Sequence, residues 1–262
     1  MPKFAANLTT MFAELEVPDR FQTARDVGFR AVEFLRPYDN SVAEVRQWLA
    51  DAELELILIN SPPGDPDADE RGLAALPGRE GAFRESLDLT LEYATGLGAG
   101  MVHLLAGVVP DGTPPIACEE VFVANLRVAA EVAKAQGVML MLEPLNLQDA
   151  PGYLHTNTTH TRKIIEAVGS DNIFLQYDLY HMQIMEGNLA EGIRRNLDLI
   201  RHIQFSSVPG RHEPQYGEVN MPHMFAAIDA LGYDGWVGCE YGAKEDTLSG
   251  LSWAKPYGLG PK

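Results

Sequence analysis

VMLMLEP, at residues 138–144, is an apolar run that ends in an acid, Glu143. Three later runs are built the same way, and each carries one polar side chain near its end: IFLQYD (173–178) with Asp178, RHIQFS (201–206) with Gln204 and WVGCEY (236–241) with Glu240. A buried carboxylate without a partner is strongly disfavoured, so an acid that closes an apolar strand is expected to bind something. The sequence therefore predicts that these four side chains converge on one site.

Apolar runs of this kind recur along the whole chain, about every 25–40 residues. Four earlier runs precede those above: KFAANL (3–8), AVEFL (31–35), LELILIN (54–60) and GMVHLLAG (100–107). Most of them are apolar along nearly their full length, which is typical of parallel strands covered by helices. Helical patterns lie between the runs, at 18–27, 41–52, 80–97, 116–136, 158–168, 188–199, 221–231 and about 245–255.

Strand and helix thus alternate eight times, and no Pro/Gly/Ser-rich linker divides the chain. This alternation predicts an α/β fold, a (β/α)8 TIM barrel that forms a single domain over residues 1–262. A doubly wound sheet is the structural alternative, although it rarely needs eight strands of such even spacing. The length of 262 residues is usual for one barrel of this type.

Composition limits the compartment and the kinds of partner. Cys118 and Cys239 suggest neither a disulfide framework nor a metal site, and no signal peptide or transmembrane run is evident. We therefore expect a cytoplasmic protein that does not contact membranes. The chain has 20 basic and 37 acidic residues, and its net charge of −17 opposes nucleic-acid binding. A small anionic substrate remains possible, because a few arginines can dominate a pocket, and so does a homo-oligomer.

The stretch SPPGDPDADERGLAALPGRE, residues 61–80, interrupts the alternation after the third strand. A loop of this length in a compact domain is usually a lid or a binding loop, so we expect an active-site loop here, with a plain surface excursion as the alternative. Arg71 and Arg79 within it are candidates for binding a carboxylate. The end of the chain, residues 257–262, is expected to fray.

The four strand-end side chains suit a hard divalent cation. In a TIM barrel the carboxyl ends of the strands face the active site, and Glu143, Asp178, Gln204 and Glu240 all lie at that end. Carboxylate and amide oxygens are the ligands that Mg²⁺ or Mn²⁺ prefers, whereas no cysteine or histidine obviously points to zinc. The alternative is that nearby arginines or helix N-termini satisfy one or two of these acids.

Several polar residues close to these strand ends are candidates for contacting a substrate. His181 follows Asp178 in YDLYHMQ, where the strand is expected to turn into a loop, and it could hydrogen-bond a substrate oxygen or serve a structural role. Asn146 and Asp149 in EPLNLQD could contact substrate hydroxyls. Arg211 in VPGRHEP could hold a carboxylate through two hydrogen bonds, or form a surface ion pair.

At this point the motifs resemble a known family. LEPLN, QYDLYHMQ, IQF with PGRHEP, and GWVGCEY resemble the hydroxypyruvate isomerases of the xylose-isomerase-like TIM-barrel superfamily, as do FAANL, AVEFL with its PY, and ALPGRE. The resemblance covers essentially the whole chain and extends to the sister 2-oxo-tetronate isomerases. It implies that Glu143 and Glu240 transfer protons, and that these two coordinate a divalent ion together with Asp178 and Gln204.

The resemblance also implies an activity. The expected enzyme is an intramolecular oxidoreductase of the aldose–ketose type, which interconverts hydroxypyruvate and 2-hydroxy-3-oxopropanoate (tartronate semialdehyde) by proton transfer through an enediolate. Mg²⁺ or Mn²⁺ would assist, Arg211 or Arg71 would hold the substrate carboxylate, and His181 would bond a substrate oxygen.

Other functions remain as alternatives to this activity. Of the related isomerases, a 2-oxo-tetronate isomerase is the nearest alternative, and a ketose 3-epimerase is further away because those enzymes usually carry histidine where Gln204 stands. An apurinic endonuclease is opposed by the net charge of −17. A sugar-acid binding protein without turnover is the non-enzymatic alternative.

Overall fold

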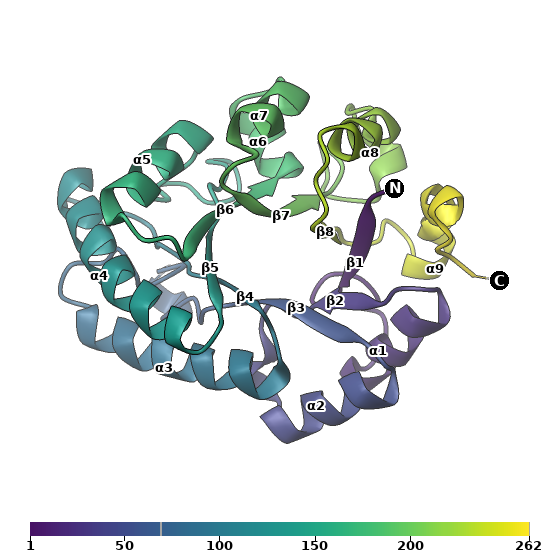
Figure 1. Ribbon diagram of the computed structural model, residues 1–262, viewed down its shortest axis with the longest axis horizontal. Coiled ribbons are helices and arrows are strands. Elements are labelled where there is room, and N and C mark those ends of the chain that lie inside the picture. The colour runs from purple at the N-terminus through teal and green to yellow at the C-terminus, as the bar shows by residue number, and fades with distance from the viewer. Residues whose placement is uncertain (69, 262) are drawn as a thin grey trace.

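The computed structural model describes residues 1–68 and 70–261, and it shows a closed barrel of parallel strands surrounded by helices (Figure 1). Each strand pairs with the next along the chain, and the last strand pairs with the first, which closes the ring. The prediction of a TIM barrel is confirmed. The strands are β1 Lys3–Asn7, β2 Ala31–Glu33, β3 Glu55–Asn60, β4 Met101–His103, β5 Met139–Leu142, β6 Ile173–Asp178, β7 Ile200–Phe205 and β8 Trp236–Cys239.

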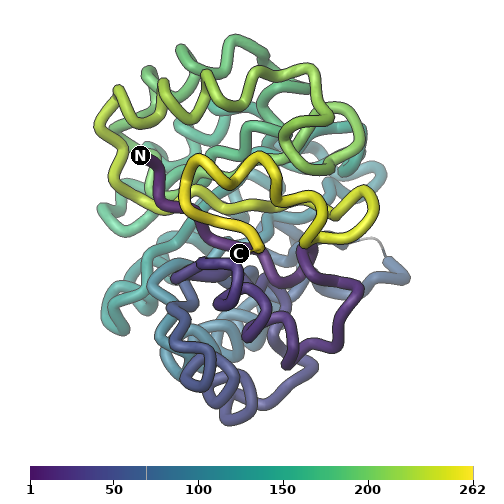
Figure 2. Tube along the Cα trace, turned by 90° about the vertical axis from the view of Figure 1, so that its right-hand side faces the viewer, coloured from purple at the N-terminus to yellow at the C-terminus, as the bar shows by residue number. Residues whose placement is uncertain are grey.

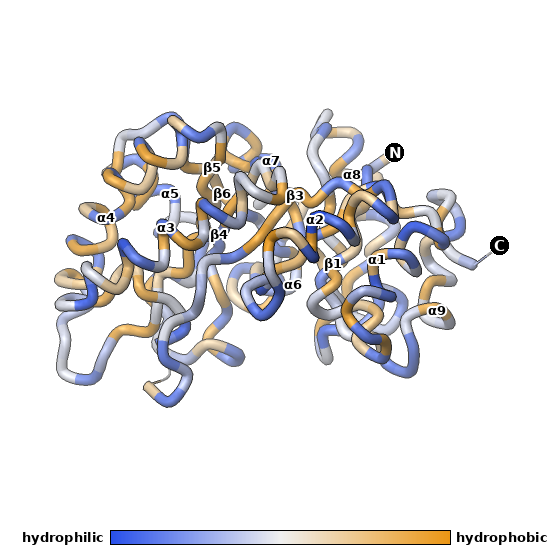
Figure 3. Tube along the Cα trace, turned by 90° about the horizontal axis from the view of Figure 1, so that it is seen from below, coloured by the Kyte–Doolittle hydropathy of each residue, from blue (hydrophilic) through white to orange (hydrophobic). Residues whose placement is uncertain are grey.

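Helices follow the strands and cover the outside of the barrel, with hydrophobic and hydrophilic residues alternating along them (Figure 3). Their starts are marked by capping side chains: Ser41 forms a capping box with Glu44, and Asn157 accepts from the backbone of His160. The helices are α1 Val17–Asp26, α2 Val42–Asp51, α3 Glu80–Leu97, α4 Pro115–Ala135, α5 Thr158–Val168, α6 Leu179–Met185, α7 Leu189–Asn196, α8 Met221–Ala230 and α9 Thr247–Gly250.

Two segments differ from the sequence-based expectation. The residues after Asp178 form helix α6 instead of a loop, because the Asp178 carboxylate caps the helix by accepting from the Tyr180 backbone at 2.9 Å. The expected helix at about 245–255 is only the short α9, followed by a 3₁₀ helix over Leu251–Tyr257. Pro256 lies inside this second segment and has no N–H to continue a helical ladder.

The expectation of a frayed tail at 257–262 is wrong for residues 257–261, while 262 lies outside the described residues. The Tyr257 ring packs edge-on against Phe4 at 5.1 Å and against Phe225 at 5.7 Å. The Gly260 N–H donates to the carbonyl of Val27 at 2.8 Å. The C-terminal segment (yellow) therefore lies against the N-terminal part of the chain (purple) in Figure 2.

The long loop after β3 is fastened to the segment that follows β4. Gly72 forms an antiparallel bridge with Ala106, and the Ala75 N–H donates to the Ala106 carbonyl at 2.8 Å. Gly72 has a φ of +137°, and a Cβ there would collide with the Leu105 carbonyl, so glycine is required at this close approach. The loop ends at Arg79, because α3 begins at Glu80.

The interior of the barrel changes from apolar to polar along the strands. A small apolar cluster, in which Ala5, Ala31, Met101 and Met141 are buried, also packs against Trp236 at the start of β8. Inward-facing polar side chains follow further along the strands, since alternate strand residues point to the same face. No helix among the described residues is long and apolar enough to cross a bilayer.

Candidate active site

Three acids reach the carboxyl end of the barrel from three different strands, and we call them the acid cluster: Glu143, Asp178 and Glu240. Glu143 directly follows β5, Asp178 ends β6 and Glu240 directly follows β8. All three side chains are buried, with exposed fractions of 4%, 1% and 8%. The predicted convergence of these acids is therefore what the fold produces, because parallel strands deliver their ends to one face.

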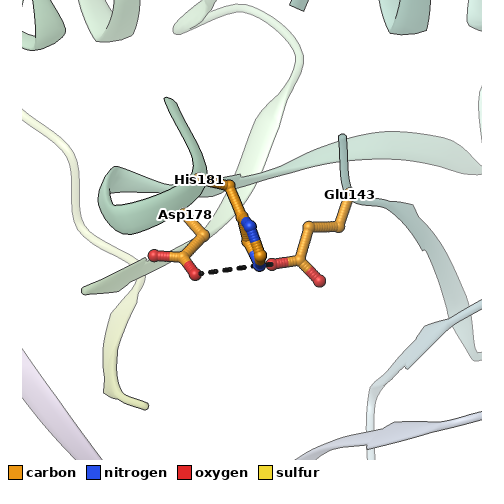
Figure 4. A group of neighbouring side chains, drawn as sticks. All are labelled: Glu143, Asp178 and His181. Carbon is orange, nitrogen blue, oxygen red and sulfur yellow. Dashed lines mark ion pairs between the residues drawn. The ribbon is translucent and has the colours of Figure 1, made fainter. Parts of the chain in front are cut away.

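Two oxygens of the acid cluster have no hydrogen-bond partner among the described residues, Glu143 Oε1 and Asp178 Oδ2. Ligand atoms of Glu143, Asp178 and His181 all lie within 4.8 Å of one another. Figure 4 shows both carboxylates pointing toward the same edge of the His181 ring. Buried carboxylate oxygens that face one another without donors are costly unless they are protonated or bind a cation, and this donor set fits a divalent ion of the Mg²⁺ or Mn²⁺ type.

Burial and mutual repulsion raise the pKa of each acid in the cluster. Burial, followed by the charges of Glu240 and Asp178, raises the pKa of Glu143 well above its usual value. Burial raises the pKa of Glu240 to about 8, against an opposing effect of Arg211. Burial likewise raises the pKa of Asp178 to about 6. An acid whose pKa lies near neutrality, as for Glu240 and Asp178, can both accept and return a proton.

His181 is held with a defined ring orientation by the segment after β5. Its Nδ1 accepts from the Asn146 backbone N–H at 3.1 Å and from the Asn146 side-chain amide at 2.7 Å. The ring proton therefore sits on Nε2, which lies 3.6 Å from Asp178 Oδ2 and 3.8 Å from Glu143 Oε1. Burial lowers the pKa of His181 well below its usual value, so the ring is neutral and offers an N–H to the site.

Asn146 lies behind His181 and does not reach the pocket wall. It is fully buried, and its amide also donates to Asp149 Oδ2 at 3.0 Å, while its oxygen accepts from the backbone of Gln148 and Asp149. The predicted contact with substrate hydroxyls is thus not what this arrangement offers. Asn146 instead orients His181 and Asp149.

Arg211 lies beside the acid cluster on the loop after β7. Its Nη2 is 2.7 Å from Glu240 Oε1 and 4.0 Å from Asp178 Oδ2, and its Nη1 is 3.9 Å from Asp149 Oδ2. The guanidinium also stacks over the Tyr180 ring at 4.9 Å. Arg211 has a φ of +53°, an uncommon backbone state for a residue with a side chain, and such states concentrate at functional sites.

A cavity of about 290 Å³ opens above the acid cluster. Arg71 of the long loop reaches its wall and donates to the backbone carbonyl of Asp149, whereas Arg79 forms an ion pair with the buried Glu70 inside the loop. Arg79 is therefore not available to a ligand in the pocket, contrary to the expectation from sequence. The lining comprises Asn60, Arg71, His103, Leu105, Glu143, Leu145, Asp149, Ala150, His181, Arg211 and Glu240.

His103 and Asn60 join the pocket from β4 and β3. His103 Nδ1 is 3.2 Å from Glu143 Oε2, and burial lowers the pKa of this histidine to about 3. Asn60 Oδ1 is buried and has no partner among the described atoms. Asn60 and Arg211 also line a second cavity of about 340 Å³, which adjoins the first and includes Thr9, Thr10, Leu35, Arg36 and Pro63.

A second polar group lies in the barrel interior, and we call it the amide network: Asn7, Glu33, Gln176, His202 and Gln204. Gln204 pairs in register with Asp178, so it lies next to the acid cluster, but it is fully buried and does not line the pocket.

Glu33 is not among the residues predicted from the sequence. An acid in the middle of the apolar run AVEFL was the signal that could have revealed it.

Comparisons with known proteins agree with this geometry. The family model described as xylose isomerase-like TIM barrel matches residues 21–257. A 2-oxo-tetronate isomerase of Cupriavidus necator is 47% identical over 98% of this chain and 99% of its own. A hydroxypyruvate isomerase of Escherichia coli (strain K12) is 41% identical over 98% of this chain and 100% of its own.

Among solved structures, a crystal structure described as an AP endonuclease, family 2, from Brucella melitensis has a TM-score of 0.95. It is 43% identical to this chain and covers 98% of it, and the match covers 99% of that chain. The resemblance seen in the sequence motifs thus extends over the full length of relatives that share the fold. The chain is an isomerase, and it belongs to the xylose isomerase-like TIM barrel family.

Proposed function

We propose that this isomerase interconverts hydroxypyruvate and 2-hydroxy-3-oxopropanoate with the help of a divalent metal ion. The observation that carries the proposal is the acid cluster: three buried carboxylates from three strands, with two oxygens that lack partners, below a cavity that has arginines in its wall. The substrates are small anions, which suits a cavity of about 290 Å³. The similarity to the hydroxypyruvate isomerase of Escherichia coli, which is 41% identical over 98% of this chain, supports the assignment.

Glu143, Asp178, Gln204 and Glu240 would hold the ion, which we propose to be Mg²⁺ or Mn²⁺. When bound, such an ion acts as a Lewis acid that stabilises negative charge on neighbouring oxygens. This stabilisation addresses the main obstacle of the reaction, because a C–H bond next to a carbonyl is only weakly acidic.

The two glutamates would carry out the proton transfers. One carboxylate accepts the proton as the C–H bond breaks, and the electron pair becomes the double bond of an enediolate. The other glutamate returns a proton to the adjacent carbon, and the hydroxyl proton moves to the former carbonyl oxygen. One carbon is thereby oxidised as its neighbour is reduced, so no external redox partner is needed. The raised pKa values of Glu143 and Glu240 suit both directions.

Neutral and cationic donors of the pocket would orient the substrate. The His181 Nε2–H is available to a substrate oxygen, since Nδ1 is already occupied by Asn146. Arg211 and Arg71 line the same cavity and would hold the substrate carboxylate. Asp149 lies between these two arginines, which it contacts through its side chain and its backbone carbonyl respectively.

A 2-oxo-tetronate isomerase is the second candidate, and the adjoining cavity favours it. That cavity shares Asn60 and Arg211 with the first and is also lined by Thr9, Thr10 and Arg36. A substrate with one more hydroxylated carbon would extend into it. In either case the proposed partner is a small anionic sugar acid in the cytoplasm, without nucleic acid or membrane, and a homo-oligomer stays a prediction.

Proton NMR of the purified protein tests the proposal. Hydroxypyruvate, 2-oxo-tetronate and a ketohexose are each incubated with the protein and Mg²⁺ or Mn²⁺, and again after EDTA treatment. We expect isomerisation of one of the two acids, loss with EDTA and recovery when the metal is restored. Turnover that is unaffected by EDTA, or turnover of the ketohexose alone, would contradict the proposal.

A further inference from the structure

The side-chain amide of Gln204 is fixed from both sides. Its Nε2 donates to Glu33 Oε2 at 2.9 Å, and its Oε1 accepts from Gln176 Nε2 at 2.6 Å. All three side chains are almost completely buried, with exposed fractions of 0% for Glu33 and Gln204 and 1% for Gln176. Water therefore does not compete for these bonds, and the amide has one defined orientation.

Glu33 determines whether the nitrogen or the oxygen of the Gln204 amide points toward β2. Its carboxylate receives three N–H groups: the Asn7 amide at 2.7 Å, the Gln204 amide at 2.9 Å and His202 Nε2 at 2.5 Å. Because its oxygens are the acceptors for these three N–H groups, the Glu33 carboxylate pairs with the nitrogen of Gln204 and not with its oxygen. The oxygen is left on the side of β6, where Asp178 is the register partner of Gln204.

From this geometry we infer that Glu33 is a positioning residue, which presents the Gln204 oxygen and not its nitrogen to the cation. An amide oxygen has two lone pairs, so one remains for a metal after Gln176 has used the other. Partners that orient a metal ligand in this way typically change metal affinity about 10–100-fold when they are mutated. The inference rests on the proposed function, because it takes Gln204 as a ligand.

Gly238 makes room for this arrangement. It pairs in register with Gln204 on the neighbouring strand β8. A Cβ at position 238 would collide with the Glu33 carboxylate and would lie 2.9 Å from Cγ of Gln204. The absence of a side chain there lets Glu33 reach across the barrel to Gln204.

An exchange of donor and acceptor tests the inference. Mn²⁺ affinity is measured without substrate, from the free Mn²⁺ signal in electron paramagnetic resonance, on the full chain. In Glu33→Gln the new amide can present either its oxygen or its nitrogen to Gln204, so the Gln204 amide is no longer held in one orientation. We therefore expect Mn²⁺ to bind about 10–100-fold more weakly. Adding Gln204→Glu restores a matched pair, because the new amide at 33 donates to the new carboxylate at 204. The double variant should bind Mn²⁺ at least about tenfold more tightly than Glu33→Gln alone.

The single variants separate this inference from the proposed function. Gln204→Ala should also weaken Mn²⁺ binding; if it does not, Gln204 is no ligand and the proposed metal site itself is wrong. If Gln204→Ala weakens binding but Glu33→Gln does not, the positioning role alone is overturned. Additive effects of Glu33→Gln and Gln204→Glu would overturn it as well, since independent sites do not compensate one another.

Gly238→Ala provides a test that changes no polar group. The added methyl should displace Glu33 and Gln204 and weaken Mn²⁺ binding, and circular dichroism shows whether the variant folds. Gly242→Ala is the matched control, because a Cβ at Gly242 meets no atom within 4 Å. Equal Mn²⁺ affinities of the two folded variants would contradict the inference.

Discussion

The acid cluster and the amide network are neighbours inside one barrel, yet their buried carboxylates differ in how many hydrogen-bond donors they have. In the amide network the Glu33 carboxylate receives three N–H groups at 2.5–2.9 Å. In the acid cluster, Glu143 and Asp178 each keep one oxygen without a partner among the described residues. Both groups contain carboxylates at strand ends, so the residue type alone does not distinguish them.

This difference separates Glu33, whose charge is satisfied by the protein itself, from Glu143 and Asp178, whose free oxygens we propose to bind a ligand. A buried carboxylate that is fully hydrogen-bonded is stable without any ligand, whereas one that lacks donors is destabilising unless it is protonated or binds a cation. The charge of Glu33 is therefore satisfied within the protein, whereas the acid cluster fits the proposed ion and substrate. Four predictions test this division, beginning with the largest effect.

Replacing either proton-transfer candidate should nearly abolish activity. For Glu143→Gln and Glu240→Gln we expect exchange of the substrate C–H with deuterated water to slow by ~10²–10⁴-fold, the usual contribution of a positioned acid or base. Proton NMR of hydroxypyruvate in D₂O measures the exchange. Glu55→Gln is a matched control, because Glu55 is exposed and begins β3 at the opposite end of the barrel. Full exchange in both site variants would refute their role.

Removing Glu33 should destabilise the fold more than removing an acid of the cluster. Glu33→Ala leaves three buried N–H groups without an acceptor, and breaking a buried pair in this way costs about 3–5 kcal/mol. Glu143→Ala removes a carboxylate that has an unpaired oxygen, so the loss should be much smaller. Urea unfolding of the metal-free variants gives both free energies. Equal losses would erase the distinction between the two groups.

The acid cluster should make the metal-free protein less stable as pH rises. Burial raises the pKa of Glu240 to about 8 and that of Asp178 to about 6, above their unfolded values. The unfolded chain therefore releases these protons first, so this contribution to stability is complete below about pH 4 and is lost as pH rises toward 8. Thermal unfolding with EDTA across this range measures it. A metal-free protein that gains stability from these groups between pH 5 and 8 would contradict the prediction.

Arg211 should matter for the substrate carboxylate, with a moderate effect. Arg211→Lys keeps the positive charge but loses the planar pair of donors, so we expect KM for hydroxypyruvate to rise about tenfold, with a smaller change in kcat. Steady-state kinetics measures both constants. Arg201→Lys is the control, because Arg201 is exposed at the start of β7 and lies over the Phe174 ring. An unchanged KM for the Arg211 variant would mean that Arg211 does not bind the substrate carboxylate.

Much of the barrel and of the acid cluster follows from the sequence alone. Apolar runs of strand length predict the eight strands, and position near the carboxyl ends of these strands brings Asp178 and Gln204 to one face of the barrel. Position at the carboxyl end of a strand then makes Glu143 and Glu240 neighbours, although they are far apart in the chain. These conclusions need only local patterns and the geometry of parallel sheets.

The remaining features depend on contacts between distant residues. His202 meets Glu33 across 169 positions of the chain, so no local pattern reveals that this acid is satisfied. The same holds for the tail, where Tyr257 finds Phe4, and for Arg79, which pairs with Glu70 instead of facing the pocket. Helix α6 is not evident from the sequence, because Asp178 both ends β6 and caps the helix that follows it directly.

The pairing of β8 with both β1 and β7 has a consequence for how the protein is made. During synthesis, the ring of backbone hydrogen bonds stays open until Trp236–Cys239 has left the ribosome, and Glu240 emerges directly after it. A nascent chain therefore lacks both its closing strand and the last acid of the cluster at the same stage.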